Sequence, residues 1–347
     1  MRVLITGHLG YVGPWMIRAF KEAGHHVTGL DVGYFRECVE ELDGFTPPDR
    51  ERVRDVRDVS AADLEDVEAI VHLAALSNDP LGHIDPALTH AINTEASLRL
   101  AGLAKSAGIR RFVFASSCSI YGGVGDKGAP ADEQATMDPL SAYARSKVDT
   151  EAGLAALADR DFEPVFMRNA TAFGVSPRMR FDLVVQNLIG WGFTTGVIRV
   201  LSDGTPWRPI VHIADMARAC VAAVTAPAAT VAGQAFNVGR DDNNFRIREI
   251  AETVVGKLPS VRLEITGEAG ADPRSYRVSF AKAASALPGF QAEWTLDRGC
   301  DEIIEWLRAG HLREHDFQSR FFVRLKQLQH LMAERFVDEE IRVRAPA

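Results

Sequence analysis

The stretch that decides the fold is ITGHLGYVG, at residues 5–13 near the start of the chain. An apolar run rich in β-branched residues, 2–6, leads into it, and apolar residues at helical spacing follow over 11–23. Gly24 can end that helix, and residues 26–31 form a second apolar run. The sequence therefore predicts a strand, a glycine-rich turn, a helix and a second strand, which together make a βαβ unit.

The glycines of this stretch have the spacing GxxGxxG. In a βα turn, Gly7 permits the tight turn, Gly10 lets the backbone approach a pyrophosphate, and Gly13 allows the helix to pack closely on the sheet. The phosphates would meet the free N–H groups and the positive end of the following helix. A plain glycine turn without a ligand is the alternative interpretation.

Asp31 ends the second predicted strand, 24 residues after Gly7. A carboxylate at this place accepts hydrogen bonds from both ribose hydroxyls and repels a 2′-phosphate, so it favours NAD over NADP. The alternative is an ordinary turn residue at the end of a strand.

Strand-like segments alternate with helical ones as far as residue 170, which predicts a parallel sheet covered by helices on both faces. We expect an α/β fold with a Rossmann-type doubly wound parallel sheet over 1–170 and a smaller C-terminal α/β substrate lobe over 171–312. Some segments of that lobe can return to the first domain. The segments behind this expectation are strands at 69–73, 111–115 and 164–168, and helices over 86–107, from 141, and over 213–224, 246–256 and 297–309.

Composition excludes several classes of protein. The 347 residues carry a net charge of −8 with both signs scattered, so nucleic acid is not an expected partner. Four cysteines far apart fit neither a disulfide framework nor a zinc site, which favours a cytoplasmic protein without a bound metal. No apolar run approaches the roughly 20 residues of a membrane span, and no signal peptide is recognisable.

The last segment, 313–347, is expected to be a helical tail. Over residues 317–336 the side chains of Phe321, Leu325, Leu328 and Met332 would share one stripe of a helix. Such a stripe predicts packing against the protein's own body, and a subunit contact is the alternative.

Tyr143 and Lys147 form a YxxxK pair, with Ser117 upstream at the end of a predicted strand. Positions four apart share a face of a helix, so the ammonium group can lie near the phenol and stabilise its anion. A tyrosine needs such help to act as an acid or base near neutrality, because its unperturbed pKa is about 10. Ser117 could hold a substrate oxygen against the phenol. A pair of this spacing also arises by chance on amphipathic helices.

In combination these residues resemble the extended short-chain dehydrogenase/reductases, especially their NAD-dependent nucleotide-sugar epimerase and dehydratase branch. The similarity runs from Arg2 to about Leu307. It rests on TGxxGxxG at 6–13, Asp31, Asp55-Val56, His72-Leu-Ala-Ala75, Asn93, Ser116-Ser117 before Ile120-Tyr-Gly122, Tyr143 with Lys147, Arg168 with Phe173-Gly174, Arg208 with His212 and Asp215, and Phe236-Asn-Val-Gly239.

The resemblance implies roles for individual residues. Lys147 would also hold the nicotinamide ribose, and Tyr143 would exchange a proton with a sugar hydroxyl while hydride passes to or from the nicotinamide. Arg208, and Arg274 or Arg277, would grip substrate phosphates, for which a guanidinium group is well suited. The expected cofactor residues are Gly7, Gly10, Tyr11, Val12, Gly13, Asp31, Asp55, Val56, Leu73, Ala74, Ala75, Asn93, Ser116, Tyr143 and Lys147; the expected substrate residues are Ser77, Ser117, Asn169, Thr171, Arg208 and Arg274.

The two residues after Ser117 narrow the reaction. Sugar 4,6-dehydratases of this family carry Asp and then Glu there, and nucleotide-sugar decarboxylases carry Glu at the second place, whereas this chain has Cys118 and Ser119. Double epimerases use a cysteine two residues before the tyrosine of the xYG motif, but Cys118 lies three before Tyr121, which indicates a packed thiol. Dehydration, decarboxylation and double epimerisation are therefore disfavoured.

The remaining set of Ser117, Tyr143 and Lys147 suffices for hydride and proton transfer at one carbinol, and a C4 epimerase needs nothing more. The family's substrate motifs are altered, because the run after Arg168 is Asn169-Ala-Thr-Ala-Phe173-Gly174 and Arg208 is followed by Pro-Ile. A net dehydrogenase or reductase and a non-catalytic NAD-sensing scaffold are the alternatives. The resemblance also implies a homodimer formed by the helix that carries Tyr143 and the long helix before Arg111.

Overall fold

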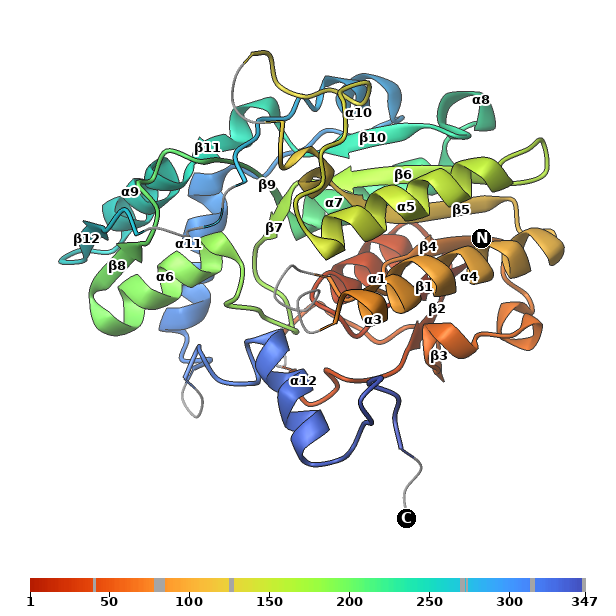
Figure 1. Ribbon diagram of the computed structural model, residues 1–347, viewed down its shortest axis with the longest axis horizontal. Helices are drawn as coiled ribbons and strands as arrows, with labels where there is room; N and C mark the ends of the chain where they lie inside the picture. Colours follow the sequence, from red (N-terminus) through yellow and green to blue (C-terminus); the bar gives the residue numbers. More distant parts are fainter. Residues whose placement is uncertain are drawn as a thin grey trace.

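The computed structural model describes residues 1–39, 42–77, 85–124, 128–268, 272, 274–312 and 316–344. Its centre is a seven-stranded sheet in the order β10-β6-β5-β4-β1-β2-β3, in which each neighbouring pair is parallel (Figure 1). This is the doubly wound sheet that the sequence predicts. The strands are β1 (Arg2–Thr6), β2 (His26–Asp31), β3 (Arg50–Val53), β4 (Ala69–His72), β5 (Arg111–Ser117), β6 (Glu163–Asn169) and β10 (Ala235–Val238).

The direction of winding changes between β1 and β4. From β1 the chain builds β2 and β3 on one side, and it then crosses back to add β4, β5 and β6 on the other. Ligands of doubly wound sheets bind at the carboxyl ends of the strands beside such a switch point. Here the carboxyl ends of β1 and β4 are linked by a contact between Thr6 Oγ1 and His72 Nδ1, which lie 2.6 Å apart. Burial lowers the pKa of His72 to about 3. The imidazole is therefore a neutral structural link.

Helices cover both faces of this sheet. The helices α4 (Ala96–Ser106) and α5 (Ala142–Leu157) pack together on the face toward the viewer in Figure 1, whereas α1 (Gly13–Glu22) packs against α7 (Ile213–Thr225) behind it. Because both faces are covered, central strands are apolar throughout, and Val3, Leu4 and Ile5 of β1 are all buried.

The helix expected over 86–107 is interrupted. It consists of α3 (Pro86–His90), a π-helical turn over Ala91–Glu95, and α4. Turns of this kind are frequent at functional sites. Here the turn carries Asn93, which the sequence predicts at the cofactor site.

The smaller lobe lies to the left of the large sheet in Figure 1. Two of its expected segments, β10 and α7, belong to the large sheet and its covering layer, so the lobe is interleaved with the first domain rather than following it. The lobe's own elements are a three-stranded sheet of β7 (Thr171–Phe173), β9 (Trp207–His212) and β11 (Asn244–Arg246), a parallel pair β8 (Val197–Val200) and β12 (Arg262–Ile265), and helices α6 (Val184–Thr195), α9 (Ile247–Lys257) and α11 (Leu296–Arg308). The short helices α8 (Ala228–Val231) and α10 (Ala281–Ala286) instead contact β6 and β10 of the large sheet.

The tail packs against the protein's own body, but its helix is shorter than expected. The helix α12 spans Arg324–Ala333, so Phe321 lies outside it, while Leu328 is fully buried. Residues 316–323 form turns instead, because the Asp316 carboxylate accepts the backbone N–H of Gln318 at 3.0 Å, a bond that competes with helix formation. Residues 313–315 and 345–347 of the expected tail lie outside the described ranges.

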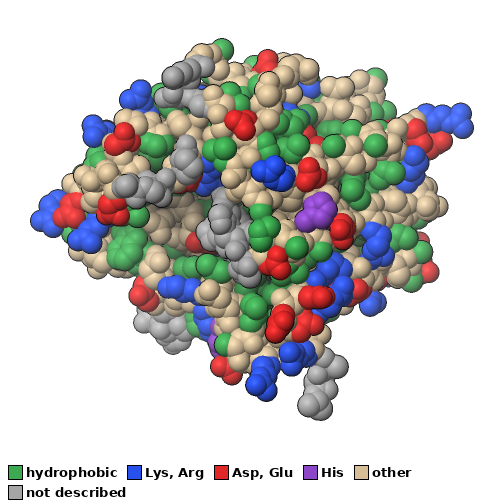
Figure 2. Space-filling view, viewed as in Figure 1, with side chains coloured by type: hydrophobic (Ala, Val, Ile, Leu, Met, Phe, Trp, Pro, Cys, Tyr) green, Lys and Arg blue, Asp and Glu red, His purple; other side chains and the backbone are tan. Residues whose placement is uncertain are grey.

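The surface carries charges of both signs. On the face drawn in Figure 2, basic and acidic side chains are interspersed, including where the tail meets the large domain at the lower edge. One contact between the tail and the large domain is the ion pair between Arg342 and Asp58, with Nη1 and Oδ2 2.9 Å apart. Within the described ranges, none of the helices combines the length and the apolar character that crossing a membrane requires.

Candidate active site

A cavity of about 690 Å³ lies at the carboxyl ends of the strands, between the two lobes. Its lining includes every residue that the sequence predicts for the cofactor, the substrate and catalysis, with the exception of Asn93. One continuous space therefore brings together residues from 7 to 274 that are far apart in the chain.

The glycine turn is shaped for a ligand that meets backbone. Gly7 has φ +75°, and a Cβ there would lie 2.7 Å from the backbone N of Ala74. A Cβ on Gly13 would lie 2.0 Å from the carbonyl oxygen of His8, so only glycine lets α1 approach this closely. Helix α1 has no side-chain cap at its N-terminus. These features fit the diphosphate of a dinucleotide, which accepts hydrogen bonds from such exposed N–H groups.

Asp31 is held in place at the end of β2. Its carboxylate accepts the backbone N–H groups of Leu9, at 3.0 Å, and Gly33, at 2.7 Å. Burial raises the pKa of Asp31, and these two hydrogen bonds oppose that effect. Asp55 is likewise fixed, because Arg57 binds both of its oxygens. The two carboxylates mark the end of the cavity where an adenosine would lie.

Tyr11 lines the cavity and also links the two lobes. The Tyr11 hydroxyl donates a hydrogen bond to the carbonyl oxygen of Gly174. The hydroxyl oxygen of Tyr11 also accepts a hydrogen bond from Gln186 Nε2 at 2.6 Å. The side chain thus ties the start of α1 to the smaller lobe.

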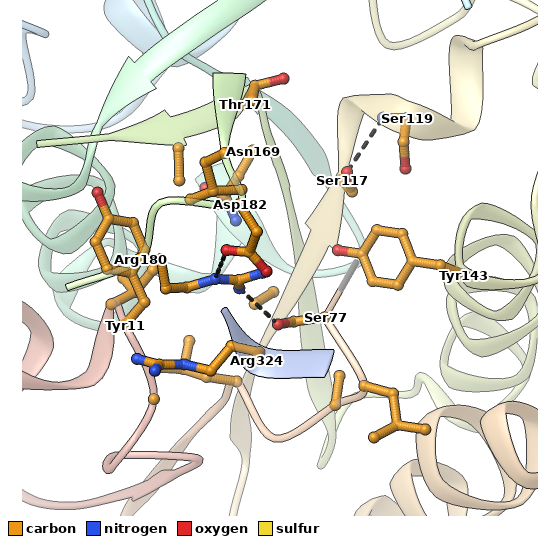
Figure 3. Close-up of a pocket in the computed structure, with 18 of the residues that line it drawn as sticks. Tyr11, Ser77, Ser117, Ser119, Tyr143, Asn169, Thr171, Arg180, Asp182 and Arg324 are labelled. Atoms are coloured by element: carbon orange, nitrogen blue, oxygen red, sulfur yellow. Dashed lines mark hydrogen bonds and ion pairs between the residues drawn. The ribbon is translucent and has the colours of Figure 1, made fainter. Parts of the chain in front are cut away.

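Ser117, Tyr143 and Lys147 meet at one end of the cavity. Figure 3 shows the hydroxyls of Tyr143 and Ser117 directed toward the same part of it. Lys147 Nζ donates to the carbonyl oxygen of Ala115 at 2.7 Å and lies 5.6 Å from the centre of the Tyr143 ring. Burial lowers the pKa of Lys147 to about 7. The lysine beside the tyrosine can therefore change its protonation state near neutral pH.

Asn93 stands behind the cavity wall. Its Oδ1 accepts the backbone N–H of Leu76 at 2.8 Å, and its Nδ2 donates to Ser146 Oγ at 3.0 Å. It therefore ties the lining segment 73–77 to α5 and positions that wall, while the neighbouring Ile92 reaches the cavity itself.

The opposite wall contains a buried ion pair that the sequence did not reveal. Arg180 binds both oxygens of Asp182, Nε to Oδ1 at 2.8 Å and Nη2 to Oδ2 at 2.9 Å, and its Nη1 donates to Ser77 Oγ at 3.1 Å (Figure 3). Burial alone would raise the pKa of Asp182, but Arg180 lowers it below its ordinary value. The signal in the sequence is the cluster of charges RMRFD at 178–182, close after Phe173-Gly174.

The far end of the cavity carries the predicted substrate arginines. Arg208 Nη2 lies 2.8 Å from Asp272 Oδ2, and Arg274 Nε donates to Asp272 Oδ1 at 2.8 Å. Two guanidinium groups thus share one carboxylate at this end of the cavity. Arg277 is outside the lining and donates to the carbonyl oxygen of Gly128 at 2.6 Å, so Arg274 is the better candidate.

The residues near Ser117 complete the reacting end. Cys118 is fully buried outside the lining, and its Sγ lies 3.0 Å from the carbonyl oxygen of Arg168, which agrees with a packed thiol. Ser119 does line the cavity. Asn169 also lines it, and its Oδ1 is buried without a hydrogen-bond partner among the described residues. This oxygen can accept a hydrogen bond from a ligand. Over the same residues, no cluster of three His, Cys, Asp or Glu side chains could hold a metal ion.

Known proteins with similar sequences agree with this geometry. Over 319 residues the chain is 28% identical to the UDP-glucose 4-epimerase of Mycolicibacterium smegmatis, across 89% of this chain and 99% of that protein. Over 335 residues it is 26% identical to UDP-glucuronic acid decarboxylase 3 of Arabidopsis thaliana, across 93% of this chain and 91% of that one.

Solved structures and a family model identify the family. MoeE5 in complex with UDP-glucuronic acid and NAD matches with a TM-score of 0.76 at 26% identity, across 89% of this chain and 99% of that one. The family model for the NAD dependent epimerase/dehydratase family matches residues 3–239, which is more than half of the chain. This chain therefore belongs to the NAD dependent epimerase/dehydratase family and is an NAD-dependent enzyme of the short-chain dehydrogenase/reductase type.

Proposed function

We propose that the protein is an NAD-dependent nucleotide-sugar 4-epimerase, which oxidises one carbinol of the sugar to a ketone and reduces it again from the other face. The observation that carries this proposal is the set of side chains at the reacting end of the cavity. Ser117, Tyr143 and Lys147 line it, whereas Cys118 and Ser119 replace the carboxyl groups that elimination or decarboxylation would use.

The tertiary structure adds two carboxylates to the cavity lining, those of Asp272 and Asp182, and the state of Asp182 supports the same choice. Both of its oxygens accept hydrogen bonds from Arg180, which lowers the pKa of Asp182 although burial alone would raise it. An ionised carboxylate of low pKa is neither a proton donor near neutrality nor a strong base. Asp182 is therefore suited to positioning rather than to removing water or carbon dioxide from a sugar.

The chain's own groups supply the proton chemistry. Tyr143 takes the proton of the sugar hydroxyl as the carbinol is oxidised and returns it when the ketone is reduced. Lys147 favours the phenolate through its positive charge, and Ser117 donates a hydrogen bond to the same substrate oxygen. Bound NAD supplies the hydride acceptor and afterwards the hydride donor. Because each transfer is reversed, the pair of half-reactions consumes no cofactor.

Arg208 and Arg274 support a nucleotide diphosphate as the substrate's handle. Both line the cavity, and both contact Asp272. Guanidinium groups bind phosphate oxygens in pairs. Named relatives act on UDP-linked sugars, so we propose a substrate of this class.

The test is incubation of the purified protein with a panel of nucleotide sugars, with isomers followed by NMR and NADH by absorbance. We expect an isomer to accumulate with no net NADH. Formation of stoichiometric NADH would show that the protein is a net dehydrogenase and not an epimerase. Release of carbon dioxide from a UDP-uronic acid would show that it is a decarboxylase.

We also propose a cytoplasmic homodimer. The four cysteines are free and buried, which suits a reducing compartment. Helices α4 and α5 lie side by side on one face of the sheet (Figure 1), where pairing with a second copy would form a four-helix interface. Analytical ultracentrifugation of the wild-type protein tests this, and a monomer at micromolar concentration would contradict it.

A further inference from the structure

Arg324, the first residue of α12, brings a side chain from the tail into the cavity. It is 2% exposed, and it lines the same space as the glycine turn and Arg180 (Figure 3). Its guanidinium lies 4.8 Å from the centre of the Phe35 ring, and it donates to the carbonyl oxygens of Phe321, at 3.2 Å, and Arg178, at 2.7 Å. Carbonyl groups satisfy hydrogen bonds but do not cancel the positive charge.

That charge has no counter-ion of its own within the described part of the chain. No carboxylate there lies within ion-pair distance of Arg324. Asp182 is the carboxylate that acts on Arg324 through space, and both of its oxygens already bind Arg180. Burial, together with repulsion from Arg180 and Arg178, lowers the pKa of Arg324 to about 10, so it remains charged at neutral pH. A buried cation without a counter-charge is costly, which indicates that an anion belongs beside it.

The rest of the tail is fastened to the rim of the cavity where the adenosine half of the cofactor would lie. Gln327 Nε2 donates to the carbonyl oxygen of Tyr34 at 3.1 Å, and Arg57 Nη1 donates to that of Glu340 at 2.8 Å. The ion pair of Arg342 with Asp58 adds a third link. The segments after β2 and β3 that receive these contacts also supply cavity lining, so the tail lies across this end of the cavity.

We propose that the tail is a strap over the bound dinucleotide and that Arg324 supplies a buried positive charge to its diphosphate. The inference depends on NAD binding and not on the choice of epimerisation, so either can fail without the other. A guanidinium group suits a diphosphate, and the exposed N–H groups at the start of α1 line the same cavity. A fixed strap would retain the reduced cofactor between two half-reactions, as an enzyme that recycles its cofactor requires.

The test compares Arg324→Met with Lys326→Met, which removes a cation from the exposed face of the same helix. Cofactor-free proteins are titrated by calorimetry with NAD, ADP-ribose, adenosine and UDP. For Arg324→Met we expect the Kd of NAD and ADP-ribose to rise about 10- to 100-fold, with adenosine binding unchanged, because a charge-assisted hydrogen bond is lost. Lys326→Met should stay within about threefold of wild type. Weaker UDP binding alone would assign Arg324 to the substrate's diphosphate, and equal weakening toward adenosine would indicate a structural role; either result overturns the proposal.

Thermal unfolding provides an independent measurement. The Tm of cofactor-free Arg324→Met should equal or exceed that of wild type, because the variant no longer buries an unbalanced charge. A lower Tm with unchanged affinity for NAD would contradict the proposal. If the variant does not fold, hydrogen exchange on the wild-type protein decides. Amides over 321–333 should gain protection with ADP-ribose but not with adenosine, and the absence of that gain overturns the proposal.

Discussion

The two walls of the cavity are built in different ways. The cofactor wall presents backbone groups and single residues at the ends of neighbouring strands, such as Gly7 after β1 and Asp31 after β2. The opposite wall, which contains Arg180, Asp182 and Ser77 and which we call the substrate wall, is formed by contacts between side chains. Arg180 there donates a hydrogen bond to Ser77, which lies 103 residues earlier in the sequence. The residues of the glycine turn are neighbours in the sequence, so a local motif predicts them. The contact of Arg180 with Ser77 forms only when distant segments fold together.

The largest expected effect on turnover comes from removing the hydroxyl group of Tyr143, the proposed proton carrier beside the cofactor wall. Tyr143→Phe should lower turnover about 100- to 10,000-fold, the usual contribution of a general acid or base, while NAD still binds. Tyr121→Phe is the matched control, because its hydroxyl bonds Arg168 and Asn237 outside the cavity lining. That control should lose stability but keep its turnover. Unaltered turnover in Tyr143→Phe would show that the tyrosine is not the proton carrier.

The stability of the protein should fall when the substrate wall loses the negative charge of Asp182. Asp182→Asn leaves Arg180 buried without its partner, so the free energy of unfolding should fall by about 3–5 kcal/mol in urea denaturation. Asp161→Asn breaks an exposed ion pair with Arg160 and should change the free energy of unfolding by less than about 0.5 kcal/mol. Similar effects of the two substitutions would mean that the Arg180–Asp182 pair contributes no more than a surface contact.

Lys147 makes the stability of the cofactor wall depend on pH. Its pKa is lowered by burial to about 7, below that of an unfolded lysine, so the protein bears the full penalty of the buried charge below pH 7. The penalty decreases as pH rises from about 7 toward 10.5. In cofactor-free protein, Lys147→Met should therefore have the higher Tm at pH 6, and its advantage over wild type should shrink by pH 9.5. A constant Tm difference across this range would refute the assignment.

The smallest expected effect compares two glycines in helices. Gly13→Ala places a Cβ against the backbone of His8 and should cost about 1–3 kcal/mol of stability, as overpacking does, with weaker NAD binding. A Cβ on Gly102, within α4, meets nothing within 4 Å, so Gly102→Ala should add about 0.4–1 kcal/mol. Chemical denaturation measures both. A neutral Gly13→Ala would show that close approach at this turn is not required.

Much of the large domain was predictable because its signals are local. Central strands covered on both faces are continuous apolar runs, and β1, β2 and β6 lie within one residue of their expected bounds. Short edge elements were missed, among them β3, β8 and β12. Of these, β3 consists of three charged residues and one valine, so no apolar run marks it. Turn chemistry at Asp316 likewise shortened the tail helix in a way that apolar periodicity does not reveal.

The candidate site divides in the same way. The glycine spacing, Asp31 and the Tyr143–Lys147 pair follow from how a strand, a turn and a helix present backbone and side chains, so the sequence alone predicted that these residues line one site. The burial of the neighbouring pair Arg180 and Asp182, its contact with Ser77 and the entry of Arg324 into the cavity were decided by tertiary structure. Their effect depends on burial and on the distance between charges, and neither quantity exists until segments remote in the chain are packed together.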